Sequence, residues 1–591
     1  MTPESVRVWE KVEITLEAVD IYANSYTDVT VWVDLKGPGF AKRVYGFWDG
    51  GNFFRVRVAA TVPGEWTWRS GANQPDAGLN NASGRFTAVE WPESDKATDV
   101  CRHGFLRVTD NGHALQYADG TPCYLIGDTW WATPTYRYRW TDAPEGKAPG
   151  PEMGFKDMVQ FRKAQGYNCI AMLAAHPAWA NDGKPARIWY DEAANIGIRA
   201  AWPQSGTNSA KAMHNEGGRP FHFPGRVPGY EDVVPDFDRI NPAYFQALDR
   251  KVDYLNAEGF VPFIEVARRD ISTVWRAFYD WPGSYARYVQ YIFSRYQANN
   301  VIFSPIHFDY HGMSIPSRNY NEPIYLVIDT YGPPPFGTPL SANASGSTLL
   351  NFDQAKWLTI HQIGNWRDHN SHWLLTEIYR ECDPPRPAFN GEPYYAGWAD
   401  YHCWFDEGGC DPDALTGGTP ADDAGTRSGM YGSFLSGGLA GHIYGAQGIW
   451  GGDIEPEAPY TMWDALTWKS GAQMGYFRDF VWSEGARFQD LVPNADLVYP
   501  NKTAEVAGNR GWAYCARTPE RDLFMLYFET GCAQPNLRGA LHGAAYMAQW
   551  YDPRVGAWID AGTLTSDAWG RIALPELPSA EDWAFKLTLV K

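Results

Sequence analysis

The sequence predicts an α/β protein in which a (β/α)8 barrel lies between an N-terminal and a C-terminal β-sandwich. At 591 residues the chain is several times longer than an ordinary domain, so we expect more than one hydrophobic core. Apolar and polar residues alternate in short segments at both ends, whereas the middle alternates short apolar runs with segments of helical periodicity. These patterns place three domains at residues 1–92, 104–486 and 487–591.

The N-terminal domain is predicted to be a sandwich because its strand-like segments are separated by turn residues. The alternating segments lie at 12–19, 29–35, 53–59 and 66–70. Glycine-containing turns at 49–52 and 62–66 supply the backbone freedom that tight hairpins need. The polar stretch at 92–99 then breaks the pattern and is predicted to be a linker.

The middle of the chain is predicted to be a barrel because eight strand candidates alternate with helical segments. The strands are expected at 123–128, 168–175, 260–267, 300–309, 339–345, 371–378, 387–393 and 440–446. The helices are expected at 155–166, 241–260, 284–298 and 353–366. The helix at 241–260 has Asn241 as its N-cap, Pro242 at its first position and Gly259 at its end. An open doubly wound sheet is the alternative, but no glycine-rich phosphate loop follows any strand.

The C-terminal domain shows strand-like alternation again, which predicts a smaller sandwich. Its segments lie at 511–517, 522–529, 544–553 and 585–590.

The chain contains eight cysteines without zinc-ligand spacing. Cys403 and Cys410 could form a disulfide, although free thiols fit their spacing equally well, and Cys123 and Cys169 are expected to be buried thiols.

Charge and composition narrow the class of partner. The formal net charge of −19, without any run of Lys or Arg, argues against nucleic acid. No apolar stretch is long enough to cross a bilayer, and the start of the chain lacks an export signal, which leaves a cytoplasmic protein or a trimmed secreted form. The 28 Trp, 34 Tyr and 29 Phe favour a carbohydrate partner, because sugar rings stack on aromatic faces. We expect no cofactor, and the oligomeric state stays open.

The candidate catalytic residues are two carboxyl groups at the ends of predicted strands. A parallel barrel carries its active site at the carboxyl ends of its strands. The polar residues at these ends are Asp128, His176, Glu265, Asp309, Asn343, Glu392 and His442. Asp309 and Glu392 end the fourth and seventh strands, and cleavage of a glycosidic bond requires such a carboxyl pair. A strand-end carboxylate taken alone is more often an ion-pair partner, and Glu392 could pair with Arg386.

Four segments together resemble the apiosidase-like catalytic domain of glycoside hydrolase family 140 and its relatives. They are RVTDNGHALQYADGTPCYLIGDTWW at 107–131, the segments 241–260 and 300–309, and the motif PAFNGEPYY at 387–395. The N-terminal segment resembles the sandwich that often precedes this barrel, and the C-terminal segment resembles a collagen-binding-type sandwich. The resemblance implies a retaining hydrolase with Asp309 as acid/base and Glu392 as nucleophile. Exo action is expected separately, because long loops are predicted to wall the site.

The implied substrate is a terminal furanose such as apiose or arabinofuranose, with a pyranoside or a non-catalytic carbohydrate-binding protein as alternatives. Relatives usually carry a pair of glycines before the acid of strand four, where this chain has His307 and Phe308. These two larger side chains are expected to narrow the site. An ionised Glu392 is expected to raise the pKa of Asp309. The loops at 131–154 and 182–236 are expected to wall the site.

Further residues are candidates for contacts with the sugar. Asp128 could accept hydrogen bonds from hydroxyl groups, and Trp130 or Trp131 could stack on a ring, although Asp128 could equally cap the next helix. Glu265 is expected to pair with Arg268 or Arg269 instead. The remaining substrate-binding candidates near the predicted strand ends are His176, His307, His311, Tyr394 and His442. His307, Asp309 and His311 alternate along the chain, which leaves a metal-dependent hydrolase as a weaker alternative.

Overall fold

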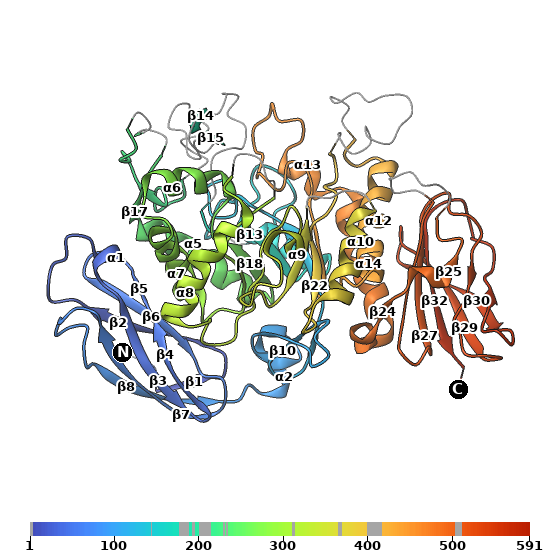
Figure 1. Cartoon of the computed structure of the whole chain (residues 1–591), viewed down its shortest axis with the longest axis horizontal. Coiled ribbons are helices and arrows are strands. Elements are labelled where there is room, and N and C mark those ends of the chain that lie inside the picture. The colour runs from blue at the N-terminus through green and yellow to red at the C-terminus, as the bar shows by residue number, and fades with distance from the viewer. Residues whose placement is uncertain are drawn as a thin grey trace.

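The structure is a computed structural model in which a central, mostly parallel sheet with surrounding helices lies between two modules made mainly of strands (Figure 1). The N-terminal module and the C-terminal module lie at opposite sides of the central part. The described residues are 4–143, 145–175, 188–191, 196–199, 214–228, 231, 234–309, 314–364, 369–398, 416–502 and 511–590.

The N-terminal module consists of a five-stranded sheet in the order β1-β8-β7-β3-β4 and a three-stranded sheet in the order β2-β6-β5. Apolar residues from both sheets share one buried cluster, in which Val12 and Ile14 of β2 accompany Val31 and Val33 of β3. The alternating pattern therefore predicted β2, β3, β6 and β7 correctly. Their bounds are β1 Ser5–Arg7, β2 Lys11–Glu17, β3 Val31–Gly37, β4 Phe40–Tyr45, β5 Phe47–Trp48, β6 Phe53–Ala59, β7 Gly64–Ala72 and β8 Ser83–Val89.

A buried network of charges joins this module to the helices of the central part. Arg57 of β6 donates to Asp249 at 2.6 Å, and Arg295 donates to both Asp249 and Asp49. Asp249 lies in helix α5 (Pro242–Ala257), and Arg295 lies in helix α7 (Gly283–Tyr296). Each charge in the network has an opposite charge beside it, as buried charges require.

The central sheet has the strand order β19-β18-β13-β12-β23-β22-β21-β20, and every neighbouring pair is parallel except β20 with β21. The extended segment 339–343 bonds to β19 on one side and to the start of β21 on the other, through Phe303 and Leu340. The sheet is therefore curled and barrel-like. The bounds are β12 Leu125–Thr129, β13 Cys169–Leu173, β18 Val261–Glu265, β19 Ile302–Ser304, β20 Gly346–Ser347, β21 His361–Gly364, β22 Ala388–Glu392 and β23 Gly441–Tyr444.

Alternate residues of these strands face opposite sides, and this alternation decides which strand-end side chains reach the site. The inward residues form one cluster: Leu125, Cys169, Ala171, Leu173, Val261, Phe263, Ile302, Phe389 and Ile443. The outward residues belong to the cluster under the helices: Ile126, Ile170, Met172, Ile264, Phe303 and Tyr444. Cys123 and Cys169 are buried free thiols as predicted, whereas Cys403 and Cys410 lie outside the described residues.

The helices lie outside the curled sheet (Figure 1). Helix α5 begins as predicted, with the Asn241 side chain accepting from the Ala243 amide at 3.2 Å and Pro242 at the first position. No helix among the described residues is long and apolar enough to cross a membrane. The other long helices are α3 Phe155–Ala164, α8 Asn321–Tyr331, α10 Asn370–Glu381, α12 Pro420–Leu435 and α14 Lys469–Val481.

Two strands and one helix of the central part differ from the prediction. The expected strand at 339–345 is an extended segment with a single bridge, between Leu340 and Phe303. The expected strand at 371–378 is helix α10, and the sixth strand, β21, lies inside the expected helix at 353–366. Leu374, Leu375 and Ile378 form a buried stripe at helical spacing on α10, which the apolar run concealed. The four residues of β21 are buried on both faces and therefore show no alternation.

The C-terminal module consists of a six-stranded sheet in the order β24-β26-β27-β32-β29-β30 and a three-stranded sheet in the order β25-β28-β31. Two buried polar contacts join it to α12: Arg427 binds both oxygens of Asp582 at 2.7 and 2.8 Å, and Ser428 donates to Glu529. The bounds are β24 Val492–Pro493, β25 Val498–Tyr499, β26 Ala513–Arg517, β27 Leu523–Phe528, β28 Asn536–Leu537, β29 Ala545–Asp552, β30 Ala557–Thr565, β31 Ile572–Ala573 and β32 Trp583–Leu589.

Candidate active site

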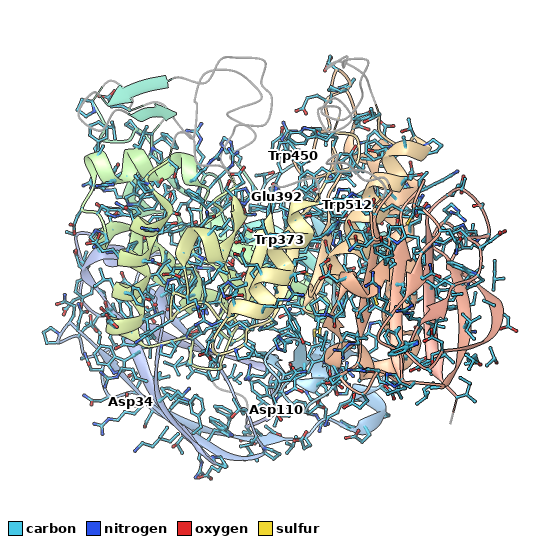
Figure 2. The ribbon with its side chains drawn as sticks, turned by 45° about the vertical axis from the view of Figure 1, so that its right-hand side comes forward. Asp34, Asp110, Trp373, Glu392, Trp450 and Trp512 are labelled. Carbon is cyan, nitrogen blue, oxygen red and sulfur yellow. The ribbon has the colours of Figure 1, made fainter. Side chains whose placement is uncertain are left out.

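Three titratable side chains meet at the carboxyl end of the central sheet. Glu392 is the last residue of β22, and His307 and Asp309 follow β19. One ligand atom from each of His307, Asp309 and Glu392 lies within 4.8 Å of the other two. The structure thus brings together the two carboxyl groups that the sequence placed at strand ends, and Figure 2 shows Glu392 at this end of the sheet.

Glycine makes the close packing around Glu392 possible. A Cβ at Gly391 would lie 2.4 Å from the side-chain nitrogen of Gln362, so a larger residue would displace the neighbouring strand. A bulge at Gly391 interrupts the alternation, so Asn390 faces the helix layer while Glu392 faces the site. Asn390 donates to Ser433 of α12 at 3.0 Å, which fixes the strand against the helix layer. The motif Asn-Gly-Glu therefore anchors β22 and presents the carboxyl group of Glu392.

Asn343 positions the carboxyl group of Glu392. Its amide nitrogen donates to Oε2 of Glu392 at 3.1 Å, and both side chains are buried. Asn343 ends the extended segment 339–343, which lies within the fifth strand candidate of the sequence, 339–345. The sequence identified Asn343 as a strand-end residue but assigned it no role, because the contact depends on how two distant strands curl toward each other.

Asp309 is held by two arginines. An extension of the β18–β19 pairing places Arg268 beside His307, and the His307 amide donates to the Ala267 carbonyl at 2.8 Å. Arg268 donates to Oδ2 of Asp309 at 3.1 Å, and Arg269 forms an ion pair with Oδ1 at 2.8 Å. The prediction that Arg268 or Arg269 would pair with Glu265 is therefore wrong.

These contacts reverse the expected pKa shift of Asp309. Burial alone would raise the pKa of its carboxyl group, but Arg268, His307 and Arg269 together hold that pKa well below its usual range. The expectation that Glu392 would raise it is wrong, because three positive charges outweigh one negative charge. Asp309 is thus a carboxylate at neutral pH in this arrangement.

Glu265, His307 and Asp309 form a chain of one hydrogen bond and one ion pair. Nδ1 of His307 binds Glu265, and Nε2 lies 3.5 Å from Asp309. Burial raises the pKa of Glu265, and the two carboxyl groups raise the pKa of His307 although burial opposes this. His307 therefore carries a positive charge at neutral pH. The sequence analysis did not predict this chain, which requires the ends of β18 and β19 to be neighbours.

Trp131 forms the wall behind His307. It is only 2% exposed, faces the inner cluster, and meets the His307 ring edge to face at a centroid distance of 4.7 Å. Trp450, which follows β23, is partly buried, packs against the same cluster and lies at the same end of the sheet as Glu392 (Figure 2). The sequence analysis did not single out Trp450, whose ring is a candidate surface for sugar stacking.

Phe308 does not narrow the site, contrary to the prediction. Its ring is buried on the outward side, 6.0 Å from the ring of Tyr320 and 6.4 Å from that of Phe352. Adjacent residues of an extended segment point in opposite directions, so only His307 of the pair occupies the interior.

The prediction that Asp128 and Trp130 bind the substrate is wrong, because both side chains face outward from the central sheet. Asp128 is fully buried, and one of its carboxylate oxygens accepts from Arg162 at 2.7 Å and from Trp130 at 2.8 Å. Trp130 is fully buried and stacks on Tyr138. These contacts belong to the layer between the sheet and the helices, where no sugar can reach.

His442 and Tyr394 also contact the helix layer. His442 is fully buried on the outward face of β23, 6.1 Å from the ring of Phe477, and burial lowers its pKa to about 3. The Tyr394 hydroxyl donates to Asp422 of α12 at 2.5 Å. The prediction of a sugar contact is therefore wrong for His442 and unsupported for the hydroxyl of Tyr394. His176, His311 and most of the loop at 182–236 lie outside the described residues.

His307, Asp309 and Glu392 are the group of described residues whose spacing would suit a metal ion. Nδ1 of His307 is bound to Glu265, and the carboxyl group of Asp309 is paired with Arg268 and Arg269. A cation at this position would lie close to two guanidinium groups. This arrangement favours acid–base chemistry of the carboxyl groups over metal binding.

A curled parallel sheet with two carboxyl groups beside each other at its carboxyl end is the arrangement of a glycoside hydrolase. Residues 109–486 match the model of the family "Apiosidase-like, catalytic domain". The chain is a glycoside hydrolase and belongs to the apiosidase-like family. The modules at its two ends match the families "Domain of unknown function (DUF5060)" over residues 5–73 and "Putative collagen-binding domain of a collagenase" over residues 492–588.

Solved structures share the fold of the chain. A "putative glycoside hydrolase" from Bacteroides vulgatus ATCC 8482 aligns over 100% of both chains with 14% identity and a TM-score of 0.61. A glycoside hydrolase family 5 protein from the same organism aligns over 83% of this chain and 94% of its own, with 16% identity and a TM-score of 0.55. None of the curated proteins matches the chain.

Proposed function

We propose that the protein is a retaining, exo-acting glycosidase that releases a terminal furanose such as apiose or arabinofuranose, with Glu392 as nucleophile and Asp309 as acid/base. The observation that carries this proposal is that one carboxylate oxygen of Asp309 lies within 4.8 Å of one carboxylate oxygen of Glu392. Retaining enzymes keep these groups about 5–5.5 Å apart, whereas inverting enzymes need about 6.5–9.5 Å to admit water. The family model supports the choice of a furanose.

In the first step Glu392 attacks the anomeric carbon and the glycosidic bond breaks as the leaving oxygen takes a proton. The hydrogen bond from Asn343 holds the attacking carboxylate in one orientation. Because Glu392 is only 5% exposed, little water surrounds it. The product of this step is a glycosyl ester of Glu392.

We propose that the proton for the leaving oxygen comes from the His307 imidazolium through Asp309. Nε2 of His307 gives its proton to Oδ2 of Asp309 as that carboxyl group protonates the leaving oxygen, and the buried Glu265 compensates the charge of His307. In the second step Asp309 accepts a proton from the water that attacks the ester. The sugar leaves with retained configuration, and the proton returns to His307.

The proposed exo action depends on the depth of the site. His307 and Glu392 are 1% and 5% exposed, so a sugar must enter a confined space to reach them. The end of a polysaccharide fits such a space, whereas the middle of a polymer needs an open cleft.

We also propose that the protein divides into three domains at residues 1–92, 104–486 and 487–591. In the second of these the curled sheet closes into a (β/α)8 barrel through the segment 339–343.

The stereochemistry of the product tests the proposed function directly. The enzyme is mixed with 4-nitrophenyl furanosides of apiose and arabinose, and proton NMR follows the first anomer released before mutarotation. We expect the anomer of the substrate. Release of the opposite anomer would reject the retaining mechanism, and cleavage of only pyranosides would reject the furanose assignment.

His307→Gln is expected to lower kcat about 100-fold on substrates whose leaving group needs a proton, because the variant lacks the proton donor to Asp309. Since the neighbouring carboxylates raise the pKa of His307, the activity of the wild-type enzyme should fall at basic pH, as the imidazolium deprotonates. The pH profile of kcat for the variant should lack this fall at basic pH. The pH dependence of kcat checks both effects.

A 2,4-dinitrophenyl glycoside provides the control, because its leaving group departs without protonation. On this substrate the first step of His307→Gln should approach the wild-type rate. An equal loss on both substrates, with an unchanged pH profile, would show that His307 has only a structural role.

A further inference from the structure

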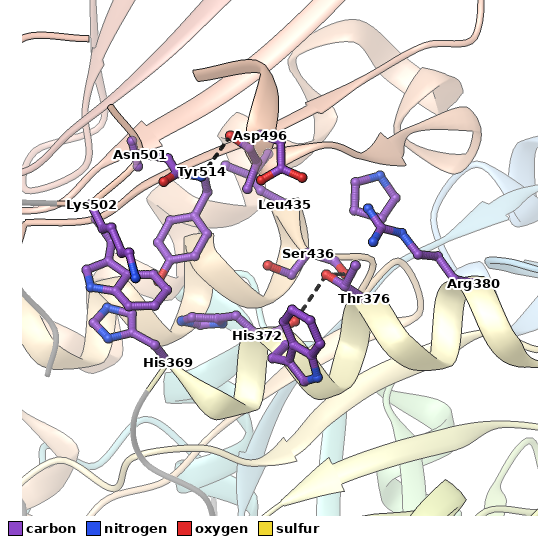
Figure 3. A pocket seen from close by; sticks show the side chains of 15 residues that line it. His369, His372, Thr376, Arg380, Leu435, Ser436, Asp496, Asn501, Lys502 and Tyr514 are labelled. Atoms are coloured by element: carbon purple, nitrogen blue, oxygen red, sulfur yellow. Dashed lines mark hydrogen bonds between the residues drawn. The ribbon is translucent and has the colours of Figure 1, made fainter. Parts of the chain in front are cut away.

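A second pocket lies outside the curled sheet, between helix α10 and the C-terminal module (Figure 3). Its volume is about 510 Å³, within the ~300–1,000 Å³ typical of small-molecule sites. His372, Thr376 and Arg380 of α10 line one side, and Asn501, Trp512 and Tyr514 of the C-terminal module line the other. The pocket therefore exists only where the two parts of the chain meet.

Aromatic rings form much of its surface. Trp373 is 71% exposed, an unusual state for so large an apolar side chain. Trp512 stacks on His369 with a centroid distance of 3.8 Å and an interplanar angle of 5°. Both tryptophans are labelled in Figure 2. Trp512 is partly buried, whereas the flat exposed ring of Trp373 is the kind of surface on which sugar rings stack.

The buried carboxylate of Glu529 holds His369, Trp512 and Tyr514 in place. Glu529 is 1% exposed and binds Nε2 of His369, the backbone amide of Trp512 and the hydroxyl of Tyr514. The distances are 2.9, 3.1 and 3.3 Å. One side of the pocket is thus fixed before any ligand arrives, which lowers the entropy cost of binding.

Polar atoms without a partner line the same space. Nδ1 of His369, Nδ1 of His372 and Nε1 of Trp512 are buried and have no hydrogen-bond partner in the part of the chain that the structure describes. His369 and His372 are each only 4% exposed. Buried polar atoms are normally hydrogen-bonded, so a ligand rich in hydroxyl groups would satisfy them.

We propose that this pocket is a second carbohydrate-binding site, which takes a short oligosaccharide segment separately from the site at Glu392. A sugar ring presents an apolar face to tryptophan and hydroxyl groups at its edge, and the pocket supplies partners for both. The helix α10 that carries Trp373 lies between β21 and β22 in sequence, so a glycan bound here lies beside the catalytic part of the chain. The site would keep a polymer attached while a chain end is cleaved.

Affinity electrophoresis tests this site with native gels that contain soluble xylan, glucomannan, mixed-linkage glucan, arabinan or pectin. All proteins carry Glu392→Gln to prevent cleavage, so the measurement of binding is independent of whether the proposed activity is correct. Trp373→Ala is compared with Trp569→Ala, a matched control because Trp569 is 77% exposed in another part of the chain. We expect retardation in at least one gel and an apparent Kd raised about tenfold by Trp373→Ala alone.

Two outcomes would overturn the proposal. One is the absence of retardation in all five gels. The other is retardation that Trp373→Ala and Trp569→Ala change equally, which would place binding elsewhere. Circular dichroism of each variant checks the fold, and because Trp373 is largely exposed, its replacement should leave the thermal midpoint unchanged.

Discussion

Glu392→Gln is expected to lower kcat by about 10⁴-fold or more while the protein stays folded. The amide has nearly the shape of the carboxylate but cannot form the glycosyl ester, so the first step is lost. Asn343 can still hydrogen-bond to the side-chain oxygen of the glutamine, which preserves the packing at this position. Initial rates on an aryl furanoside measure the loss, and a thermal melt measures the fold.

Two further variants make this test specific. Glu576→Gln replaces an exposed glutamate of the C-terminal module and should leave the rate unchanged. Glu392→Ala leaves space for a small external nucleophile, so sodium azide should restore turnover and give a glycosyl azide of inverted configuration. Activity of Glu392→Gln near the wild-type level would refute the assigned nucleophile.

Asp128→Ala is expected to reduce the free energy of unfolding by about 3–5 kcal/mol, because it leaves the guanidinium of Arg162 buried without its counter-charge. Both partners are 0% exposed and are joined at 2.7 Å. Urea unfolding monitored by fluorescence measures the change. The KM for an aryl glycoside should stay the same, since Asp128 faces away from the site.

The double variant Asp128→Leu with Arg162→Met provides the control. It removes both charges, so most of the lost stability should return, because apolar pairs can replace a buried ion pair at little cost. A raised KM with unchanged stability in Asp128→Ala would instead support the original prediction of a sugar contact.

Most of the fold could be predicted from the sequence, because strand alternation and helix caps are local signals. The cap of Asn241 and Pro242 was predicted correctly, and so were β2, β3, β6 and β7 of the N-terminal module. The exchange of strand and helix between 353 and 378 arose because β21 is buried on both faces and α10 carries a short apolar run. Neither element shows the period that distinguishes the two structures.

The pairing of Asp309 with Glu392 could also be predicted, since both follow strands whose carboxyl ends share one edge. The direction in which each side chain points could not be predicted as easily. Gly127 and Thr129 face the interior, whereas Asp128 between them faces the helix layer. An error of one residue in the predicted strand therefore moves a side chain from one side of the sheet to the other. The Glu265–His307 chain and the arginines at Asp309 depend on contacts between neighbouring strands, which no single motif encodes.

The buried charges that join the three parts of the chain limit how such a protein can change during evolution. Arg427 of the central part pairs with Asp582 of the C-terminal module. Asp249 of the central part pairs with Arg57 of the N-terminal module. A recombination event that exchanged one module alone would leave an arginine or an aspartate buried without its partner, at about 3–5 kcal/mol for each. We therefore expect these modules to be exchanged together with the central part rather than as independent units.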